Sequence, residues 1–396
     1  MLQESAFRRI AVRAETINEN DQLPLLEEAR ESVQAALDGI ANGSIRAAKG
    51  TLQNLMVERA SLYGFLANNR IRQSATSAEI WSSYEAAREA IKQAVSITDT
   101  YFPLDVGLWT PADILRQAPL TETQRAELTA DIYATLDQVD PQTLPEDQKL
   151  RFEARRQAVG QQLRNQALSD SAYQALEEAG STAGYFLRAR SLGPDLSKAS
   201  VTNTEGARDA ADYLQARLAK IGHDERCLSL LLEYRWIAEL GRRPLRGERQ
   251  PLPYSELSRR DILQIVRALN HCSGSSARHG IKYLEAVLAW VLGDEQAAQQ
   301  LFRHLSNETE YEVSGRIIRR HIITDAHRHP RKFKGRIEGE RSEGHWRLRV
   351  DGLNQMISVL SRDFPNEDLG YGRSLVDFAI AFNFIGPIAD PIRGRG

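Results

Sequence analysis

Hydrophobic residues recur at three- and four-residue steps through most of this chain, up to about residue 325. In the segment 44–66, Ala48, Leu52, Leu55 and Leu62 follow this spacing and fall on one side of a helix. Short breaks rich in Gly, Pro, Asn or Asp separate the amphipathic runs. The pattern predicts helices at 44–66, 79–97, 123–139, 147–168, 171–190, 204–221, 224–240, 257–270, 280–292 and 294–305.

Prolines and capping residues indicate where the helices end and begin. We interpret Pro103, Pro111 and Pro119 as breaks between helices, because proline lacks the N–H that a helix interior needs. Thr121 and Asn203 each place a side-chain acceptor just ahead of a predicted first turn. The prediction is therefore a series of helices joined by short connections.

The pattern changes near the end of the chain. Val376, Phe378 and Ile380 alternate with other residues, which is typical of a strand with one buried face. Gly386-Pro387 follows, and Ala389 continues the apolar pattern. We predict a half-buried strand, a Gly-Pro turn and a short final strand.

Several helices share a pattern of small and apolar residues. Ala298, Phe302 and Leu305 show a small residue, an apolar residue four later and another three later; the preceding helix carries Ala286 and Trp290. The same pattern occurs at Ala48-Leu52-Leu55, Ala87-Ile91-Ala94 and Ala207-Ala211-Leu214. This arrangement resembles the tetratricopeptide repeat, in which small residues let paired helices pack closely. The period of 34 residues is not kept, so the resemblance implies an irregular helical-repeat array; the alternative is a bundle of unrelated hairpins.

The C-terminal pattern, V-x-F-x-I from Val376 and then G-P-x-A, resembles the last two strands of the cold-shock domain, an OB-type barrel. The segments 333–337, 346–350 and 356–359 match its first three strands. The fold class expected from both resemblances is mainly α, with an irregular TPR-like helical-repeat array over 1–325 and a small barrel over 326–396.

The sequence departs from the cold-shock pattern where nucleic acid would bind. That family stacks bases on aromatic residues of its second and third strands. Here the second strand offers only His345 and Trp346, and the third offers none. Phe382 and Phe384 follow the fourth strand and are expected to be core residues. The resemblance therefore supports a barrel better than it supports base stacking.

The junction between the two predicted domains is strongly basic. Eleven Lys and Arg residues lie between Arg316 and Arg349, against four acidic ones. Cations beside a barrel face neutralise phosphates, and an aromatic ring stacks on a base. The candidate nucleic-acid-binding residues are Arg328, Arg331, Lys332, Lys334, Arg336, Trp346 and Arg349. The alternative is a solvated linker with a charged outer strand face.

A second basic run, comprising Arg242, Arg243, Arg246 and Arg249, lies in a Pro-rich loop. We interpret it as an exposed connector rather than as a phosphate site.

No motif in the sequence indicates catalysis or a cofactor. Neither a P-loop nor a GxSxG elbow is present, and His271-Cys272 is a pair of sequence neighbours only. His327-x-His329 lacks the third and fourth ligands that a metal site needs. We therefore expect a non-enzymatic protein that binds no metal and no cofactor.

Composition favours a soluble cytoplasmic protein. The net charge of −2 over 396 residues means that attraction to nucleic acid must come from a local patch. Two cysteines, Cys227 and Cys272, make a disulfide framework unexpected, and no apolar stretch is long enough to span a membrane.

Two hypotheses for function follow from these patterns. In the first, the array binds a protein partner, and the barrel docks against that partner or against the last helices. The candidate groove aromatics are Tyr213, Tyr234, Trp236, Tyr283 and Trp290, with core packing as the alternative for each. In the second, the barrel and the basic junction bind single-stranded nucleic acid. A weaker hypothesis, by analogy of architecture alone, is the sensor part of a bacterial stress or antiviral defence assembly.

Overall fold

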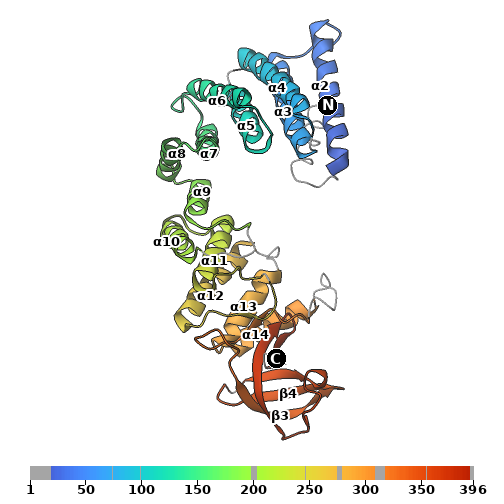
Figure 1. Ribbon diagram of the computed structural model, residues 1–396, viewed down its shortest axis with the longest axis vertical. Helices are drawn as coiled ribbons and strands as arrows, with labels where there is room; N and C mark the ends of the chain where they lie inside the picture. The colour runs from blue at the N-terminus through green and yellow to red at the C-terminus, as the bar shows by residue number, and fades with distance from the viewer. Residues whose placement is uncertain are drawn as a thin grey trace. The chain divides into compact units, whose positions relative to one another are not determined.

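The chain forms a consecutive series of helices followed by a mixed β-sheet (Figure 1). In this computed structural model the described residues are 19–73, 75–98, 100–197, 203–245, 247–273, 279–307, 317–353 and 355–392. They contain thirteen α-helices, which confirms the mainly helical fold class. The helices are α2 (Glu19–Ala41), α3 (Lys49–Arg72), α4 (Ser77–Ile97), α5 (Phe102–Gln117), α6 (Glu122–Asp137), α7 (Glu146–Gln162), α8 (Gln166–Glu178), α9 (Thr182–Leu192), α10 (Thr204–Ile221), α11 (Glu225–Leu240), α12 (Glu256–Ser273), α13 (His279–Val291) and α14 (Glu295–Asn307).

Two compact units make up the chain, Met1–Gly184 and Tyr185–Gly396. The second unit holds both the last helices and the sheet. The boundary expected from sequence, between residues 325 and 326, lies inside this second unit. The basic residues Arg246 and Arg316 of the sequence analysis lie outside the described residues.

The caps at Thr121 and Asn203 are confirmed, and the small-residue pattern holds on α14, but Ala48 is exposed and precedes α3 as its N-cap. The side chain of Thr121 accepts from the backbone N–H of Gln124, and Asn203 Oδ1 accepts from the N–H of Gly206 at 2.9 Å. Ala298 of α14 is fully buried, and it lies in one core with its neighbours on α13. Side-chain capping replaces hydrogen bonds that the first turn of a helix cannot make itself.

The prediction that Pro103 and Pro111 separate helices is wrong, because both lie within α5. Pro103 occupies the first turn, where its missing N–H would have had no partner in any case. Pro111 stands in the helix interior, yet it is buried with Leu108 and Ile114. Burial of this apolar face holds the helix together despite one absent hydrogen bond. The segment predicted as one helix at 171–190 is likewise two, because the chain turns at Gly180 with φ 66° between α8 and α9.

Five strands close into a small barrel, and a short outer pair is added to it. The barrel strands are β3 (Phe333–Ser342), β4 (His345–Val350), β5 (Met356–Leu360), β6 (Ser374–Asn383) and β7 (Gly386–Pro391). β3 pairs with β4, β4 with β5, β5 in parallel with β7, β7 with β6, and β6 with β3. The strands predicted at 333–337, 346–350 and 356–359 are therefore confirmed. β1 (Gln250–Pro251) and β2 (His321–Ile322), which the sequence did not predict, extend the sheet beyond β6.

A β-bulge corrects the predicted face of the fourth barrel strand. Phe378 and Ile380 are fully buried as expected, but Val376 is 56% exposed. Phe333 pairs with Phe378 and Gly335 with Leu375, so β6 carries one extra residue at this point. The extra residue moves Val376 to the outside and leaves Leu375 inside. The Gly-Pro pair is also displaced from the predicted turn, because Gly386 already pairs with Asn383 at the start of β7.

The interior of the barrel is continuous with the core of helices α10 to α14. α13 and α14 lie next to the barrel (Figure 1). The ring of Trp290 on α13 packs edge-on against Phe382 of β6, with centroids 5.3 Å apart, and Gln355 Nε2 donates to the Trp290 carbonyl at 3.0 Å. Helices α10 to α14 and the barrel therefore form one folded body within the second unit.

Candidate nucleic-acid interface

The outer faces of β3 and β4 carry three of the six cations predicted to bind nucleic acid, Lys334, Arg336 and Arg349. Along β3, Lys334 and Arg336 are exposed while the residues between them are buried; along β4, Arg347 and Arg349 are exposed on either side of buried Leu348. Residues two apart on a strand lie about 6.6 Å from each other on one face. The alternation therefore gathers these four side chains on one surface, which we call the basic face.

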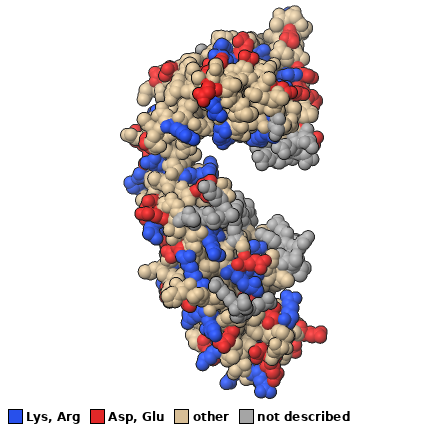
Figure 2. Space-filling view, in the orientation of Figure 1, with Lys and Arg blue, Asp and Glu red and all other residues tan. Residues whose placement is uncertain are grey.

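Two cations of the basic face are directly opposite each other across the two strands. Arg336 pairs in register with Arg349, a like-charge pair that is unfavourable in the absence of an anion. Glu338 partly offsets this repulsion, because its Oε1 accepts from Arg349 Nε at 2.8 Å. Over the visible surface of the barrel, basic and acidic side chains are interspersed, so the positive potential is local (Figure 2).

Trp346 does not share the basic face. Its neighbours Arg347 and Arg349 point outward, whereas Trp346 is half-buried, packs against the barrel core and donates from Nε1 to Ser361 Oγ at 3.0 Å. Adjacent residues of a strand point to opposite faces, so the ring cannot lie among these cations. Arg347 belongs to the face but was not among the predicted site residues; its two-residue spacing from Arg349 was the available signal.

Arg331 and Lys332 lie just ahead of β3. The Arg331 guanidinium sits 5.1 Å from the centre of the Phe333 ring, and Lys332 Nζ lies 3.4 Å from Asp377 Oδ1. Both partners of the Lys332–Asp377 pair are largely exposed, so the pair adds little to stability. The two cations extend the basic face toward the helices.

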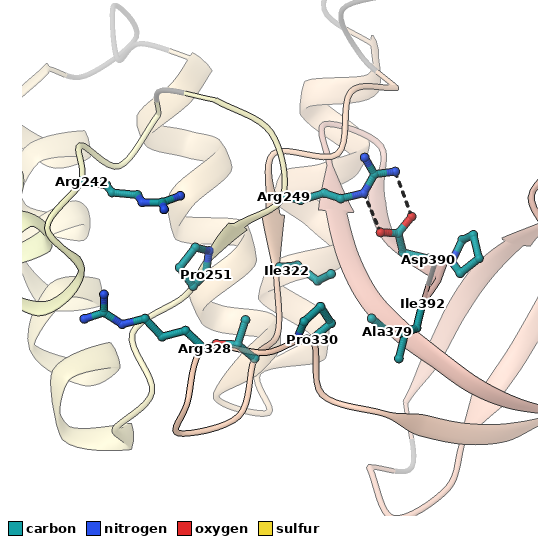
Figure 3. Close-up of a pocket in the computed structure, with 11 residues that line it drawn as sticks. Arg242, Arg249, Pro251, Ile322, Arg328, Pro330, Ala379, Asp390 and Ile392 are labelled. Carbon is teal, nitrogen blue, oxygen red and sulfur yellow. Dashed lines mark hydrogen bonds and ion pairs between the residues drawn. The ribbon is translucent and has the colours of Figure 1, made fainter. Parts of the chain in front are cut away.

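Arg328, the first predicted residue, lines a pocket between the helices and the barrel (Figure 3). The pocket has a volume of about 410 Å³. Its walls come from the loop after α11, from the segment after β2, and from β6 and β7; its lining residues include Arg242, Arg249, Pro251, Ile322, Pro330, Ala379 and Ile392. Arg242 and Arg249 belong to the loop that we interpreted as a plain connector, so part of that basic run lies at this pocket.

A buried carboxylate holds one side of the pocket together. Asp390 of β7 is 2% exposed and accepts from Arg249 Nε at 2.7 Å and Nη2 at 3.2 Å (Figure 3). Arg319 also binds Asp390, and it binds Asp363 as well. Hydrogen bonding to Asp390 raises the pKa of Arg249 above its usual range, which keeps this guanidinium charged. The network joins the loop after α11 to the last strand of the barrel.

Four of the five aromatic residues predicted for a partner groove lie in the core. Tyr234, Trp236, Tyr283 and Trp290 are at most 2% exposed, and only Tyr213 is half-exposed. In this structure the four cannot line an open groove. Core packing, the alternative considered for each of them, is therefore their position.

Trp236 and Tyr283 pack against His321 of β2, and Trp290 packs against Phe382 of the neighbouring strand β6. His321 Nε2 donates to the carbonyl of Pro244 at 2.8 Å, and its Nδ1 lies 3.1 Å from the hydroxyl of Tyr283. The Trp236 ring packs edge-on against the imidazole. Burial lowers the pKa of His321 to about 4, so the imidazole is neutral at pH 7. Helical aromatics thus contact the protein's own sheet.

The described residues include no group of three or more His, Cys, Asp or Glu side chains placed to hold a metal ion. Among the helices in those same ranges, none has the length and apolar character needed to cross a bilayer. Comparison with protein-family models, with curated proteins and with solved structures gave no match to this chain.

Proposed function

We propose that the C-terminal barrel is of the OB type and that the protein binds single-stranded nucleic acid on the basic face, without catalysis. The observation that supports this proposal most directly is a set of four exposed cations on adjacent strands of a closed barrel: Lys334, Arg336, Arg347 and Arg349. Numbered from the first barrel strand, the pairing order is 1-2-3-5-4-1, with a parallel contact between the third and fifth strands. OB-type barrels bind oligonucleotides over their second and third strands. The basic face lies on the first and second strands and so shares β4 with that surface.

The chemistry of the basic face favours phosphate recognition over base recognition. Guanidinium groups bind phosphate oxygens with paired hydrogen bonds, and their charge displaces counterions from the strand. On β3, β4 and β5 the exposed aromatic ring is that of His345 alone, so base stacking contributes little here. We therefore expect binding that depends strongly on salt and weakly on sequence.

A fluorescence-anisotropy titration with labelled single-stranded RNA and DNA tests this proposal. Each phosphate contact contributes about −0.7 to the slope of log K against log salt, so four contacts weaken binding about 50-fold between 50 and 200 mM salt. Replacing Lys334, Arg336 or Arg349 by Gln should each reduce the slope by about 0.7. The matched control is Arg260→Gln, an exposed arginine of α12 paired with Glu256. No binding at 50 mM salt, or slopes unchanged in all three variants, refutes the proposal.

A groove in the first unit favours a second candidate function, binding of a protein partner by the helices. The groove has a volume of about 460 Å³ and runs between α3 and α5 toward α7. Phe65, Phe102 and Trp109 supply aromatic walls, and Arg151 and Arg155 stand at the α7 side. Such a surface suits an extended peptide with an aromatic or apolar side chain.

A buried aspartate fixes the two arginines of this groove. Asp105 is fully buried and accepts from Arg151 Nε and Arg155 Nε, each at 2.8 Å. Burial alone would raise the pKa of Asp105, but the two guanidiniums outweigh it and lower the pKa. The two guanidiniums are thereby held beside Phe102, while Glu58 and Asp113 add negative charge elsewhere in the groove lining.

Site-specific photocrosslinking tests the groove. A benzophenone amino acid at Phe102, which is 37% exposed, should crosslink a bound protein partner in cells. The same probe at Tyr254, which is 60% exposed in the loop before α12, serves as the control for non-specific capture. The same crosslinked proteins at both positions would count against a partner in the groove.

A further inference from the structure

The pocket of Figure 3 carries more positive charge than the protein neutralises. Arg249 has Asp390 as its counterion, but Arg242 has no hydrogen-bond or ion-pair partner among the described residues. Arg328 donates to the backbone carbonyls of Glu239 at 3.0 Å and Leu240 at 3.4 Å. These carbonyls end α11, where the helix dipole places partial negative charge, so Arg328 is partly compensated. Arg242 therefore brings an unpaired guanidinium to the pocket, and Arg328 brings a second one whose charge is only partly offset.

The backbone at this pocket is held in an uncommon conformation. Arg249 has φ 48° and Arg328 has φ 64°, two of the four positive values found at non-glycine residues in the described chain. A residue with a side chain is disfavoured in this region, and such residues often occur at binding sites. At Arg249 the parallel pair of Gln250 with His321 and the contact with Asp390 hold the strained geometry.

The remaining walls of the pocket are mainly apolar, and Thr324 adds one hydroxyl group. The apolar lining residues are Pro251, Ile322, Pro330, Ala379, Pro391 and Ile392. A ligand that fits therefore combines an anionic group, for the guanidiniums, with a compact body that tolerates apolar contact. A sugar carrying a phosphate has this combination.

The pocket also lies at the start of the basic face. Pro330 lines the pocket, Lys332 follows two residues later, and Lys334 and Arg336 continue along β3. A strand on the basic face that runs toward the helices thus reaches the pocket. The loop after α11 supplies the far wall, so the strand would meet the pocket with an end rather than pass through it.

We propose that this pocket binds the terminal phosphate of the nucleic-acid strand. A terminal phosphomonoester carries a charge near −2 at pH 7, whereas an internal phosphodiester carries −1. The doubly charged group matches Arg242, whose guanidinium can donate paired hydrogen bonds, and Arg328, whose charge adds to the attraction while two of its N–H groups hold the end of α11. This inference rests on the proposed function, because the basic face delivers the strand to the pocket.

The test compares three oligonucleotides of one sequence with the full-length protein at fixed salt. One carries a 5′-phosphate, one a 3′-phosphate and one only hydroxyl ends. One of the phosphorylated strands should bind about tenfold more tightly than the hydroxyl strand, the factor expected for a single added charge-assisted hydrogen bond. Arg242→Gln should remove this preference, and Arg260→Gln should preserve it.

Arg328→Gln should also remove the preference. Because this change also removes the hydrogen bonds to the last carbonyls of α11, the result counts only if the circular dichroism spectrum of the variant matches that of the unaltered protein. Equal binding of all three strands overturns the inference and leaves the proposed function standing. If no strand binds, the proposed function fails, and thymidine 5′-monophosphate then tests the pocket directly by calorimetry. Binding of this nucleotide that Arg242→Gln abolishes would keep the pocket as a phosphate site; no binding would overturn it.

Discussion

Replacing Asp390 by Asn should strongly destabilise the second unit. The change removes a buried negative charge that is the shared counterion of Arg249 and Arg319. The side chains of these two arginines are 45% and 12% exposed, respectively. Breaking a buried ion pair by removing one partner costs about 3–5 kcal/mol. Arg249 is half in solvent, and Asp363 stays beside Arg319, so the low end, about 3 kcal/mol, applies. For a unit of this size the melting temperature should fall by roughly 6–12 °C.

Calorimetric melting at pH 7 measures this effect, and Asp377→Asn is the matched control. Asp377 also pairs with a cation, Lys332, but both side chains are more than 60% exposed. Its φ of 55° suits asparagine, so the control changes charge without straining the bulge. We expect the control to cost at most about 1 kcal/mol. Equal shifts for Asp390→Asn and Asp377→Asn would refute the role of burial in this network.

Two further predictions concern the join between helices and barrel and the barrel itself. Because the folded pKa of His321 is about 4 and the unfolded value about 6.5, the unfolded state binds the proton first. The free energy of unfolding should therefore fall by about 3 kcal/mol in total as the pH drops from about 6.5 to 4. Urea titrations of His321→Gln should lack this pH dependence, whereas the control His345→Gln, a change at an exposed histidine, should keep it. In Gly335→Ala the new Cβ would lie 2.3 Å from the Arg349 carbonyl oxygen, so the urea midpoint should fall by the equivalent of roughly 1–3 kcal/mol; an unchanged midpoint would contradict the close strand approach.

Local periodicity was sufficient to predict most helices and the barrel strands, because the spacing of apolar residues close in sequence determines which face of each element is buried. It failed at α5, where Pro103 and Pro111 signal breaks but tertiary burial retains the helix. It also failed at Val376, since a bulge of one residue reverses which side chains face inward. The bulge residue, Asp377, adopts a left-handed φ that no hydrophobic pattern reveals.

The candidate site, too, could be predicted only in part from the sequence. The cations of β3 and β4 could be found from sequence, because alternation along a strand places Lys334, Arg336 and Arg349 on one face. The pocket could not be found, since Arg249 and Asp390 are 141 residues apart and neither belongs to a motif. Trp346 was placed with the cations by proximity in sequence, whereas strand geometry separates it from them.

The burial of β6 explains why the barrel depends on the helices. From Phe378 to Phe384 every residue is buried, so the strand reads as a continuous apolar run rather than an alternating one. β2 pairs with the edge of this run at Phe382 and Ala381, and α13 covers its end through Tyr283 and Trp290. A fragment confined to residues 326–396 would expose these surfaces to water and lose the Asp390 contacts with Arg249 and Arg319. Elements of the second unit, α13 above all, thus support β6 and β7 of the barrel, and variants of either part must be assayed in the full-length protein.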